Sequence, residues 1–526
     1  MIVEKVLQPS YNTVIENVLP MLRKRSKLSY IGMAILCLVA KQIYSAYSVP
    51  KHLQRFPKVS FLSMIRSFLI KESVANRTKR LITPLTNAGH GFYVCKIPLT
   101  WTVFVTDPIA AKTLLLKTDY FPKSHAFFDT LGDSSPAVQF LGKQNVAVSN
   151  GETWKRQRKI MNPAFLRSSP VKTFSNVAHN LIDLIETESD AVPIANRMKS
   201  FTLDALGLSA FGFDFQSLKG DPEGWTDTYN IVITSLFNPY VNIFAKFDFL
   251  MKYISPERRR INKATIRFNN MLQGLADKRR QEIVNGETRG IPESEKDLLT
   301  LMIEADIRDG SETTTTELRH NIALFFLAGH DTTAHTLAFC LYNLAKNKHV
   351  QRKAREEVLN ILGDKPIDVD PTAEDLKRMD YITLIIKENL RRNGPVDKLL
   401  SRDAAEDINL NGTLIPKGQK ISIDFNSIHM NPKLWHNPEE FIPERFEQGG
   451  EYDQHEGFTW LPFSNGSRQC IGMNFSLTEQ KVLLSMILHK YEIDIDVNSP
   501  HYNAVVFDTA FTFAPQSLRL KFIKRY

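Results

Sequence analysis

The sequence of 526 residues predicts a mainly α-helical globular protein with small β-sheets. Apolar residues after Gly472 recur at the spacing of a helix that buries one face. A second, long helix is predicted after Asp309-Gly310, where a turn is followed by a helix-capping sequence and an apolar run. Strand-forming residues crowd together mainly between Phe92 and Val105, so the sheet content is expected to be small.

The composition is typical of a folded catalytic domain. Hydrophobic residues make up 43% and charged residues 23% of the chain, which excludes wholesale disorder. None of the four cysteines, Cys37, Cys95, Cys340 and Cys470, forms a CxxC pair, which argues against a disulfide framework and against a structural zinc site. The net charge of +9 indicates an anionic neighbour, either a membrane surface or an acidic protein. Nucleic acid is not expected, because no zinc-finger, basic-zipper or RNA-binding signature is present.

The amino-terminal residues predict a membrane attachment ahead of the main domain. We divide the chain into an extension over residues 1–27, a membrane anchor helix over residues 28–49 and a catalytic domain over residues 50–526. The apolar run in the second segment is interrupted by Lys41 and Gln42, so it barely reaches the roughly 20 residues that a membrane helix needs. A buried amino-terminal helix is the alternative. Basic residues flank both ends, so charge does not predict the topology.

The middle of the chain leads into the long helix. The polar stretch from Asn285 to Lys296 contains two glycines and a proline and predicts a surface connection. Thr314-x-x-Glu317 then matches a capping box, which predicts the start of a helix running towards Leu341.

The cysteine-containing loop carries the strongest chemical signal. The ten residues that end at Gly472 read F-S-N-G-S-R-Q-C-I-G, and Cys470 is expected at the amino terminus of the helix that follows. The unpaired N–H groups and the dipole there favour a thiolate, the form of cysteine that binds metal. Gly466 and Gly472 are expected to let the backbone turn closely around the sulfur. A lone cysteine in this setting is otherwise a small buried hydrophobe.

This loop resembles the haem-binding signature of the cytochrome P450 family, F-x-x-G-x-R-x-C-x-G. Phe463, Gly466, Arg468, Cys470 and Gly472 are all in register with it. The resemblance, to the eukaryotic microsomal type, implies a cytochrome P450 fold in which haem b (iron protoporphyrin IX) lies between the long helix and the helix after the cysteine loop. Cys470 is then the axial ligand, and a thiolate ligand favours cleavage of the O–O bond.

The long helix contains the sequence A-G-H-D-T-T at residues 328–333. Gly329 in a helix interior costs about 1 kcal/mol relative to alanine, which suggests close approach by another element. The Thr332 hydroxyl is expected to bond the carbonyl of Ala328 and open a polar groove. By resemblance to the family's motif, Asp331 and Thr332 form an acid-alcohol pair that delivers protons to bound dioxygen. Taken alone, these residues indicate only packing threonines and a surface ion pair.

Further family positions match charged residues of this sequence. Glu388-x-x-Arg391 places an acid and a base on one helical face, and the resemblance implies that Arg445 joins them in a buried network behind the haem. Charge-assisted partners for the haem propionates are implied at four positions, namely Trp154, Arg158, Arg402 and Arg468.

The positions that line the substrate pocket in the family are mostly apolar here, which favours a lipophilic substrate. One departure is Asn393-Gly394-Pro395, where the family usually has a histidine and two prolines, and the following segment contains Asp397 and Lys398. The apolar stretch Leu236 to Leu250 is expected either to dip into a membrane or to belong to the core. The candidate pocket residues are Phe325, Phe326, Ala328, Val396, Leu399 and Phe507.

The resemblance implies a monooxygenase that inserts one atom of O2 into a lipophilic substrate. The electrons would come from NADPH through the flavoprotein NADPH-cytochrome P450 reductase, with cytochrome b5 as a further partner. Lys155, Arg156 and Lys159 are expected to form a basic docking surface, or simply a solvated charge run. The implied location is the endoplasmic reticulum membrane, with a single span and a cytosolic catalytic domain.

Other functions remain open from the sequence. One keeps the haem but rearranges or dehydrates a hydroperoxide without external electrons, and the intact Asp331-Thr332 pair disfavours it. The others are a haem-binding sensor without turnover and a membrane-anchored scaffold without haem.

Overall fold

The computed structural model describes residues 48–526, apart from 71, 73, 87, 89, 90, 97–99, 168, 189, 190, 239, 240, 242–244, 311, 312, 509–513 and 516. It also describes positions 32, 34, 36–38, 40, 41 and 44, which are helical and exposed. The predicted extension and most of the predicted anchor lie outside these residues. No helix within the described part of the chain has the length and hydropathy of a membrane span.

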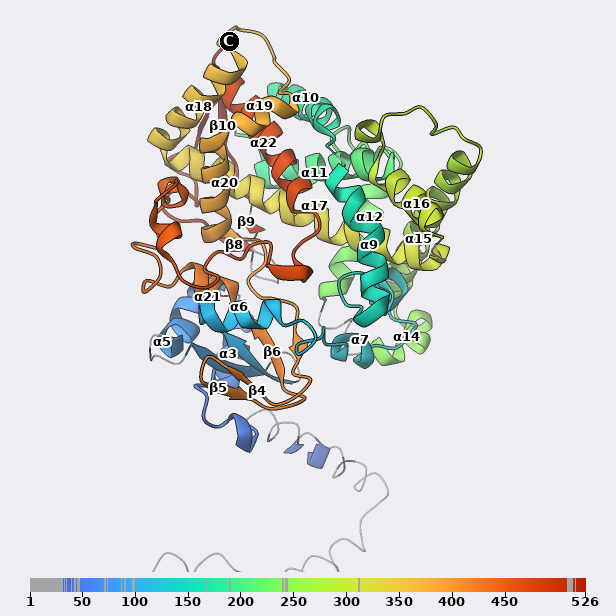
Figure 1. Cartoon of the computed structure of the whole chain (residues 1–526), viewed down its shortest axis with the longest axis vertical. Coiled ribbons are helices and arrows are strands. Elements are labelled where there is room, and N and C mark those ends of the chain that lie inside the picture. The colour runs from blue at the N-terminus through green and yellow to red at the C-terminus, as the bar shows by residue number, and fades with distance from the viewer. Residues whose placement is uncertain are drawn as a thin grey trace, which may run out of the picture.

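Helices dominate the structure, in agreement with the predicted fold class, and the small sheets are spread along it, with β4, β5 and β6 at the opposite end from β10 (Figure 1). The helical elements of the first half are η1 (Lys51–Leu53), α3 (Phe61–Leu69), α4 (Val74–Arg77), η2 (Thr78–Ile82), α5 (Thr83–Leu85), α6 (Pro108–Leu116), α7 (Ala126–Thr130), α8 (Pro136–Leu141), α9 (Gly151–Arg167), α10 (Val171–Thr187), α11 (Ile194–Phe211), α12 (Trp225–Phe237), η4 (Ala245–Phe247), α14 (Asp248–Ile254) and α15 (Pro256–Val284).

The helical elements of the second half are η5 (Glu293–Glu295), α16 (Leu298–Asp309), α17 (Thr315–Lys346), α18 (Lys348–Leu362), α19 (Ala373–Arg378), α20 (Asp380–Asn393), α21 (Phe425–His429), η6 (Pro443–Phe446), η7 (Glu451–Gln454), η8 (Gly466–Arg468) and α22 (Met473–Lys490). The connection predicted over residues 285–296 is confirmed, since it joins α15 to α16 with only the short η5 inside it.

The largest sheet of the described residues has the strand order β1-β2-β6-β3. The predicted strand region forms its first hairpin, in which β1 (Phe92–Lys96) pairs antiparallel with β2 (Trp101–Val105). Two strands from much later in the chain extend it, because β6 (Lys420–Ile423) runs parallel to β2 and β3 (Arg402–Asp403) pairs antiparallel with β6. The remaining sheets pair β4 (Ile408–Leu410) with β5 (Thr413–Ile415), β7 (Tyr491–Asp494) with β10 (Lys521–Lys524), and β8 (Phe507–Asp508) with β9 (Ala514–Pro515).

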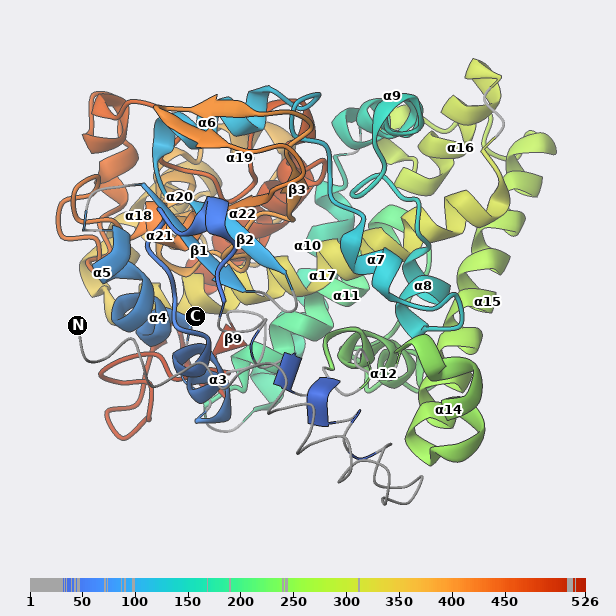
Figure 2. The ribbon, with the colours of Figure 1, turned by 90° about the horizontal axis from the view of Figure 1, so that it is seen from below.

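The long helix α17 crosses the centre of the molecule, with α11 packed beside it (Figure 2). It begins where the sequence predicts, because the Thr314 hydroxyl accepts a hydrogen bond from the N–H of Glu317 at 3.1 Å. Only this half of the capping box forms between the two residues. The Glu317 carboxylate instead accepts hydrogen bonds from Arg156 and Gln157 of α9, at 2.8 and 2.7 Å. The start of α17 is therefore joined to α9.

The main hydrophobic core surrounds α17. Several aromatic rings pack around Phe326 of α17. The Phe326 ring stacks on that of Phe211 in α11, with 4.5 Å between the ring centroids. Phe215 and Phe268 approach the same ring at 5.4 and 5.8 Å. Offset and edge-to-face rings of this kind add to the free energy of apolar burial. The core thus fixes α17 from the side that faces α11 and α15.

Candidate active site

The cysteine loop places Cys470 just before α22. The Cys470 N–H donates to the Phe463 carbonyl at 2.9 Å, which closes the loop, and the side chain of Cys470 is exposed while Cys95 and Cys340 are buried. The prediction that Cys470 lies at the helix terminus needs one correction, because the N-cap residue is Gly472 and the helix starts at Met473.

The pKa of Cys470 also differs from the expected direction. Cys470 keeps exposed surface, but the protein atoms packed around its sulfur desolvate the thiolate and raise the thiol pKa, while the Gly472 N–H and the Arg158 guanidinium lower it. A helix terminus lowers a thiol pKa only within its first turn, and Cys470 precedes that turn. A bound cation would act in the same direction as these two groups and favour the thiolate.

The two glycines of the loop have different roles. Gly466 has a φ of +74°, and a Cβ there would lie 2.9 Å from the Leu115 carbonyl oxygen. Gly472 has a φ of −85°, and the nearest atom to a Cβ would be on Phe165 at 3.8 Å. Only Gly466 is thus required by the backbone of the loop, and the expectation that both glycines are needed for the turn is corrected.

Gly466→Ala is expected to destabilise the protein by about 1 to 3 kcal/mol, through left-handed backbone strain and the contact with α6. A thermal unfolding midpoint measures the effect. Gly274→Ala is the matched control, because Gly274 lies within α15 with no atom within 4 Å of an added Cβ, and alanine favours a helix. Equal midpoints for the two variants would contradict the role of Gly466.

Cationic side chains converge beside the cysteine loop. Arg158 of α9 donates to the Gln469 carbonyl at 2.7 Å, and the Arg468 guanidinium lies 3.7 Å from the centre of the Trp154 ring. Arg402 is fully buried in β3 and bonds the carbonyl oxygens of Leu114 and Phe121. The structure thus brings together four predicted site residues from three separate segments, Trp154, Arg158, Arg402 and Arg468.

Several donors of this group have no protein partner. Trp154 Nε1, Arg158 Nε, and Arg402 Nε and Nη2 are buried without a hydrogen-bond partner among the described residues. Burial lowers the pKa of Arg402 to about 10, and burial together with Arg402 and Arg158 lowers that of Arg468 to about 10. No carboxylate of the described residues pairs with these arginines. Because uncompensated buried donors are costly, the group fits a ligand that brings its own carboxylates.

Lys123 belongs to the same group, and the sequence analysis did not identify it. Its backbone N–H and carbonyl are bound by the Asn150 side chain, both at 2.9 Å, and it bridges to Arg402 at the edge of the sheet. Burial, and then the charges of Arg402 and Arg468, lower the pKa of its amine to about 7. No motif surrounds Lys123, so only the packing of the folded chain shows it.

Glu388, Arg391 and Arg445 meet in a buried ion network between α20 and η6. Arg391 Nε lies 2.7 Å from Glu388 Oε2, and Arg445 Nε lies 3.4 Å from Glu388 Oε1. Arg391 also donates to the carbonyl oxygens of His429 and Pro438, at 2.7 and 2.8 Å. The side chains of Glu388 and Arg391 are both 0% exposed, so every charge depends on its partners.

At the centre of α17 the hydrogen bond that the sequence predicts is present. The Thr332 hydroxyl donates to the Ala328 carbonyl at 2.6 Å. At Gly329, a Cβ would make an ordinary van der Waals contact with Leu206 of α11 at 3.4 Å, so α11 lies next to this position without requiring glycine there. Asp331 does not bond Thr332 and lies 3.8 Å from Lys199 Nζ and 3.5 Å from His330 Nδ1.

The candidate pocket residues separate into two sets. Ala328 and Val396 are exposed, as a pocket lining would be. Phe326 is fully buried in the aromatic core, and Phe325 packs edge-to-face on Phe165.

The remaining two pocket candidates are Leu399 and Phe507. Leu399 packs against the hydrophobic cluster beside the large sheet, while its neighbour Leu400 exposes 57% of its surface. The backbone of Phe507 lies in β8, and its side chain is outside the described part of the structure.

The segment that departs from the family pattern is held by polar contacts. Asn393 accepts a hydrogen bond from Asn343 of α17 at 3.1 Å, and a Cβ at Gly394 would lie 2.7 Å from the Leu390 carbonyl oxygen. The Lys398 ammonium donates to Asp397 at 2.5 Å. This lysine is therefore compensated by a neighbouring carboxylate.

Two other predicted surfaces are clarified by the structure. Lys155, Arg156 and Lys159 of α9 are each paired, with Glu152, Glu317 and Asp309 respectively, so these three residues are less cationic together than the sequence indicates. The apolar stretch 236–250 divides: Leu236, Val241 and Ala245 are buried, whereas Phe247, Phe249 and Leu250 are exposed.

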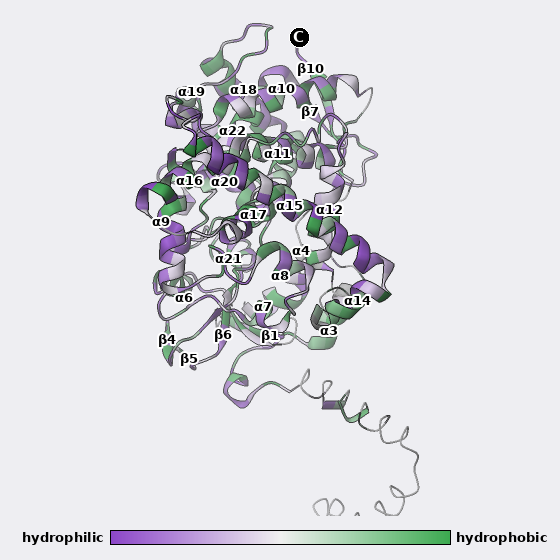
Figure 3. Cartoon of the chain, turned by 90° about the vertical axis from the view of Figure 1, so that its right-hand side faces the viewer, coloured by the Kyte–Doolittle hydropathy of each residue, from purple (hydrophilic) through white to green (hydrophobic). Residues whose placement is uncertain are grey.

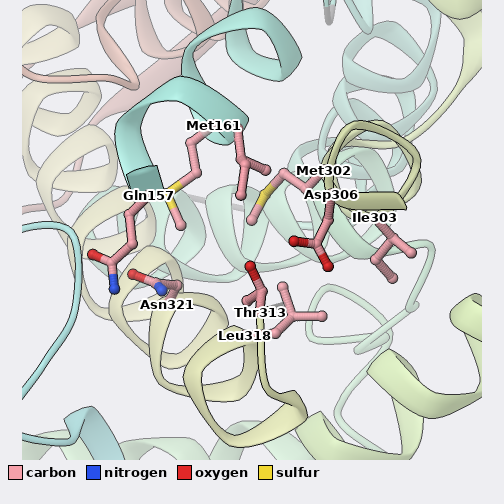
Figure 4. Close-up of a pocket in the computed structure, with 9 residues that line it drawn as sticks. Gln157, Met161, Met302, Ile303, Asp306, Thr313, Leu318 and Asn321 are labelled. Atoms are coloured by element: carbon pink, nitrogen blue, oxygen red, sulfur yellow. The ribbon is translucent and has the colours of Figure 1, made fainter. Parts of the chain in front are cut away.

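A cavity between α9, α16 and the start of α17 lies apart from these groups (Figure 4). Its polar lining includes Gln157, Asp306 and Asn321, and none of the predicted site residues takes part. Asn321 already bonds the N–H of Val146, and Gln157 bonds Glu317. We assign this cavity to helix packing.

Comparisons with known proteins agree with this arrangement. The chain matches the family described as Cytochrome P450 over residues 67–522. It is 28% identical to Cytochrome P450 3A7 of Homo sapiens, with 76% of this chain and 78% of that protein covered. It is 27% identical to Cytochrome P450 4F12 of Homo sapiens (90% and 91% covered) and 28% identical to Taurochenodeoxycholic 6 alpha-hydroxylase of Sus scrofa (75% and 77% covered).

A solved structure shows the same fold. The crystal structure of cytochrome P450DA heme domain superposes with a TM-score of 0.72 at 24% identity, covering 90% of this chain and 98% of that one. The match of the family to most of the chain, together with the cysteine loop and the buried cations beside it, leads to one conclusion. This chain belongs to the cytochrome P450 family and is an oxidoreductase.

Proposed function

We propose that this protein is a haem-thiolate monooxygenase that inserts one atom of O2 into a lipophilic organic substrate. The observation that carries the proposal is the convergence of an exposed Cys470 thiol with a group of buried cations that have no carboxylate partners among the described residues. Haem b has the matching chemistry, with iron for the sulfur and two carboxylates for the cations. When bound, haem supplies the activation of dioxygen, which a thiolate ligand promotes.

Each group of site residues has its own proposed role. Cys470 would bind the iron, and Trp154, Arg158, Arg402 and Arg468 would bind the haem carboxylates through the donors that lack protein partners. The Glu388 network would hold the segment behind this site in place. Asp331 precedes Thr332 in α17 and lies beside the Lys199 ammonium, so its carboxylate would take up protons and the Thr332 hydroxyl Oγ1 would pass them on.

The substrate class follows from the exposed side chains near these groups. Ala328, Val396 and Leu400 are apolar and exposed, which suits a lipophilic molecule. The relative named as a 6 alpha-hydroxylase carries out an oxygen insertion, and the same reaction class is proposed here. Two electrons from NADPH would enter through a flavoprotein reductase, with cytochrome b5 as a further donor.

We further propose membrane attachment at the endoplasmic reticulum, with residues 28–49 as a single-pass anchor between an extension (1–27) and a cytosolic catalytic domain (50–526). Two described helices support it. On α3, Leu62 and Leu69 expose 55% and 78% of their surface, and on α14, Phe249 and Ile254 expose 59% and 63%. Both helices lie at the same end of the molecule (Figure 3). Such apolar faces suit a lipid surface.

Lys123→Met is expected to speed haem loss by about tenfold or more, because a charge-assisted bond to a haem carboxylate contributes about 1.5 to 3 kcal/mol. Transfer of haem to a scavenging globin measures the rate. Lys117→Met is the matched control, since Lys117 is an exposed lysine outside this group. A rate equal to that of the wild-type protein would remove Lys123 from the haem site.

The proposed function is tested with purified protein, a flavoprotein reductase, NADPH and a panel of lipophilic compounds. Substrate-dependent consumption of NADPH and O2, with one oxygen atom from labelled O2 in the product, is the expected result. A product formed from a hydroperoxide without NADPH indicates the isomerase or dehydratase alternative. Haem binding without turnover indicates a sensor.

A further inference from the structure

Lys199 of α11 faces the acid of the oxygen-side helix. Its Nζ lies 3.8 Å from Asp331 Oδ1, across the interface where α11 packs along α17 (Figure 2). The carbonyl oxygen of the same lysine accepts a hydrogen bond from His330 Nε2 at 3.0 Å. One residue of α11 therefore contacts two consecutive residues of α17, at the turn that contains the proposed proton donor.

The charged and titratable groups around Asp331 come from three helices. They are His330 and His335 of α17, Lys199 of α11 and Tyr229 of α12. Burial alone would raise the pKa of Asp331, but His330, Lys199 and His335 together lower it below its usual value. Burial, and then the Asp331 charge, raise the pKa of Tyr229, which keeps its proton and donates to the Phe326 carbonyl.

His330 does not provide a lasting positive charge. Burial lowers its pKa, and because Nε2 donates to the Lys199 carbonyl, Nδ1 of the neutral ring is an acceptor that faces Asp331 at 3.5 Å. Two acceptors cannot share a hydrogen bond. The Lys199 ammonium is thus a lasting cation beside the Asp331 carboxylate, at 3.8 Å.

Lys199 and Asp331 form a partly exposed ion pair without a direct hydrogen bond. A separation of 3.8 Å is too long for a hydrogen bond but short for two opposite charges. Lys199 exposes 45% of its side chain and Asp331 exposes 22%, so water reaches both groups. An ammonium at this distance favours the ionised carboxylate without occupying its lone pairs, which remain free to accept a proton from water.

We propose that Lys199 is a positioning residue for proton delivery, holding the Asp331 carboxylate ionised and facing water so that it can be reloaded after each transfer towards Thr332 Oγ1. The inference rests on the proposed function, because the proton has a destination only if dioxygen is reduced at this site. In each cycle the carboxylate accepts one proton from water, passes it on and returns to its ionised form. No electrons move in this step.

The first test measures the Asp331 carboxyl itself and needs no turnover. Infrared titration of the holoprotein, with the Asp331→Asn variant used to assign the band, gives the Asp331 pKa in wild-type protein and in Lys199→Met. The substitution removes the Lys199 charge, which lowers the Asp331 pKa, while burial still raises it. The Asp331 pKa is therefore expected to rise by about one unit. Lys199→Arg is expected to keep the wild-type value. Lys278→Met removes an exposed, ion-paired lysine from α15 and serves as the control.

The second test measures coupling with the reductase and a substrate. Product formed per NADPH is expected to fall about tenfold in Lys199→Met, with more hydrogen peroxide and a larger solvent isotope effect, and to be restored in Lys199→Arg. An unchanged Asp331 pKa overturns the inference, and so does a shifted pKa with unchanged coupling. If wild-type protein forms no product with any substrate, the proposed function fails, and the infrared titration still decides the role of Lys199.

Discussion

Replacing Cys470 with alanine is expected to abolish the thiolate-type absorption band of the reduced, CO-treated protein, and all product formation with it. Cys470 is the one cysteine of the 463–472 loop, and its exposed sulfur lies beside the cationic group. No cluster of three or more histidine, cysteine or acidic residues in the described part of the chain offers iron another site. Without the sulfur, only the contacts to its carboxylates would hold the haem. The absorption spectrum would then no longer be that of a thiolate-ligated haem.

Cys340→Ala is the matched control for this variant. Cys340 is fully buried in α17, and burial raises the pKa of its thiol beyond the range in which it ionises. The control should keep the band and the activity, with at most a small loss of stability from the missing sulfur atom. A thiolate band that persists in Cys470→Ala would contradict the assignment of the ligand.

Glu388→Ala should destabilise the protein by about 3 to 5 kcal/mol, because it leaves two buried arginines without their shared carboxylate. Arg391 then loses both of its short bonds to Glu388 and keeps only carbonyl partners. Since the free energy of unfolding of a domain is only about 5 to 15 kcal/mol, the substitution would remove a large part of it. Chemical denaturation of the purified protein, followed by circular dichroism, gives the free energy of unfolding.

The chain contains a matched pair for comparison. Glu374 and Lys377 have the same spacing along a helix and a similar separation of 2.7 Å, but their side chains are 78% and 71% exposed. Glu374→Ala should therefore leave the denaturation midpoint almost unchanged, because water replaces the lost partner. Similar effects of the two substitutions would show that burial does not determine the strength of the Glu388 network.

Much of the site could be predicted because its chemistry is local in sequence. The loop that ends at Gly472, the turn around Asp331 and the spacing of Glu388 and Arg391 are each contained in a few residues. Such patterns fix which side chains share a helical face or a turn. The bond from Thr332 to Ala328 was predictable for this reason, since four residues separate its ends.

The rest depended on contacts between distant segments. Phe325 and Phe326 differ by one position, and only the packing of α9, α11 and α15 shows which aromatic rings each of them contacts. The pairing of Arg156 with Glu317 likewise joins residues far apart in the chain, so a run that reads as basic is neutralised in the fold. Lys123 was missed because nothing near it in sequence marks its approach to Arg402.

The order of these segments has a consequence for how the protein is made. The residues proposed to surround the haem extend from Lys123 to Cys470, and β6, which supports Arg402, also comes late in the chain. A polypeptide that emerges from the ribosome amino terminus first exposes the early cations long before the sulfur ligand exists. Binding of the proposed haem is therefore expected late in biosynthesis, and a chain truncated before Cys470 would leave those buried cations without the ligand proposed to neutralise them.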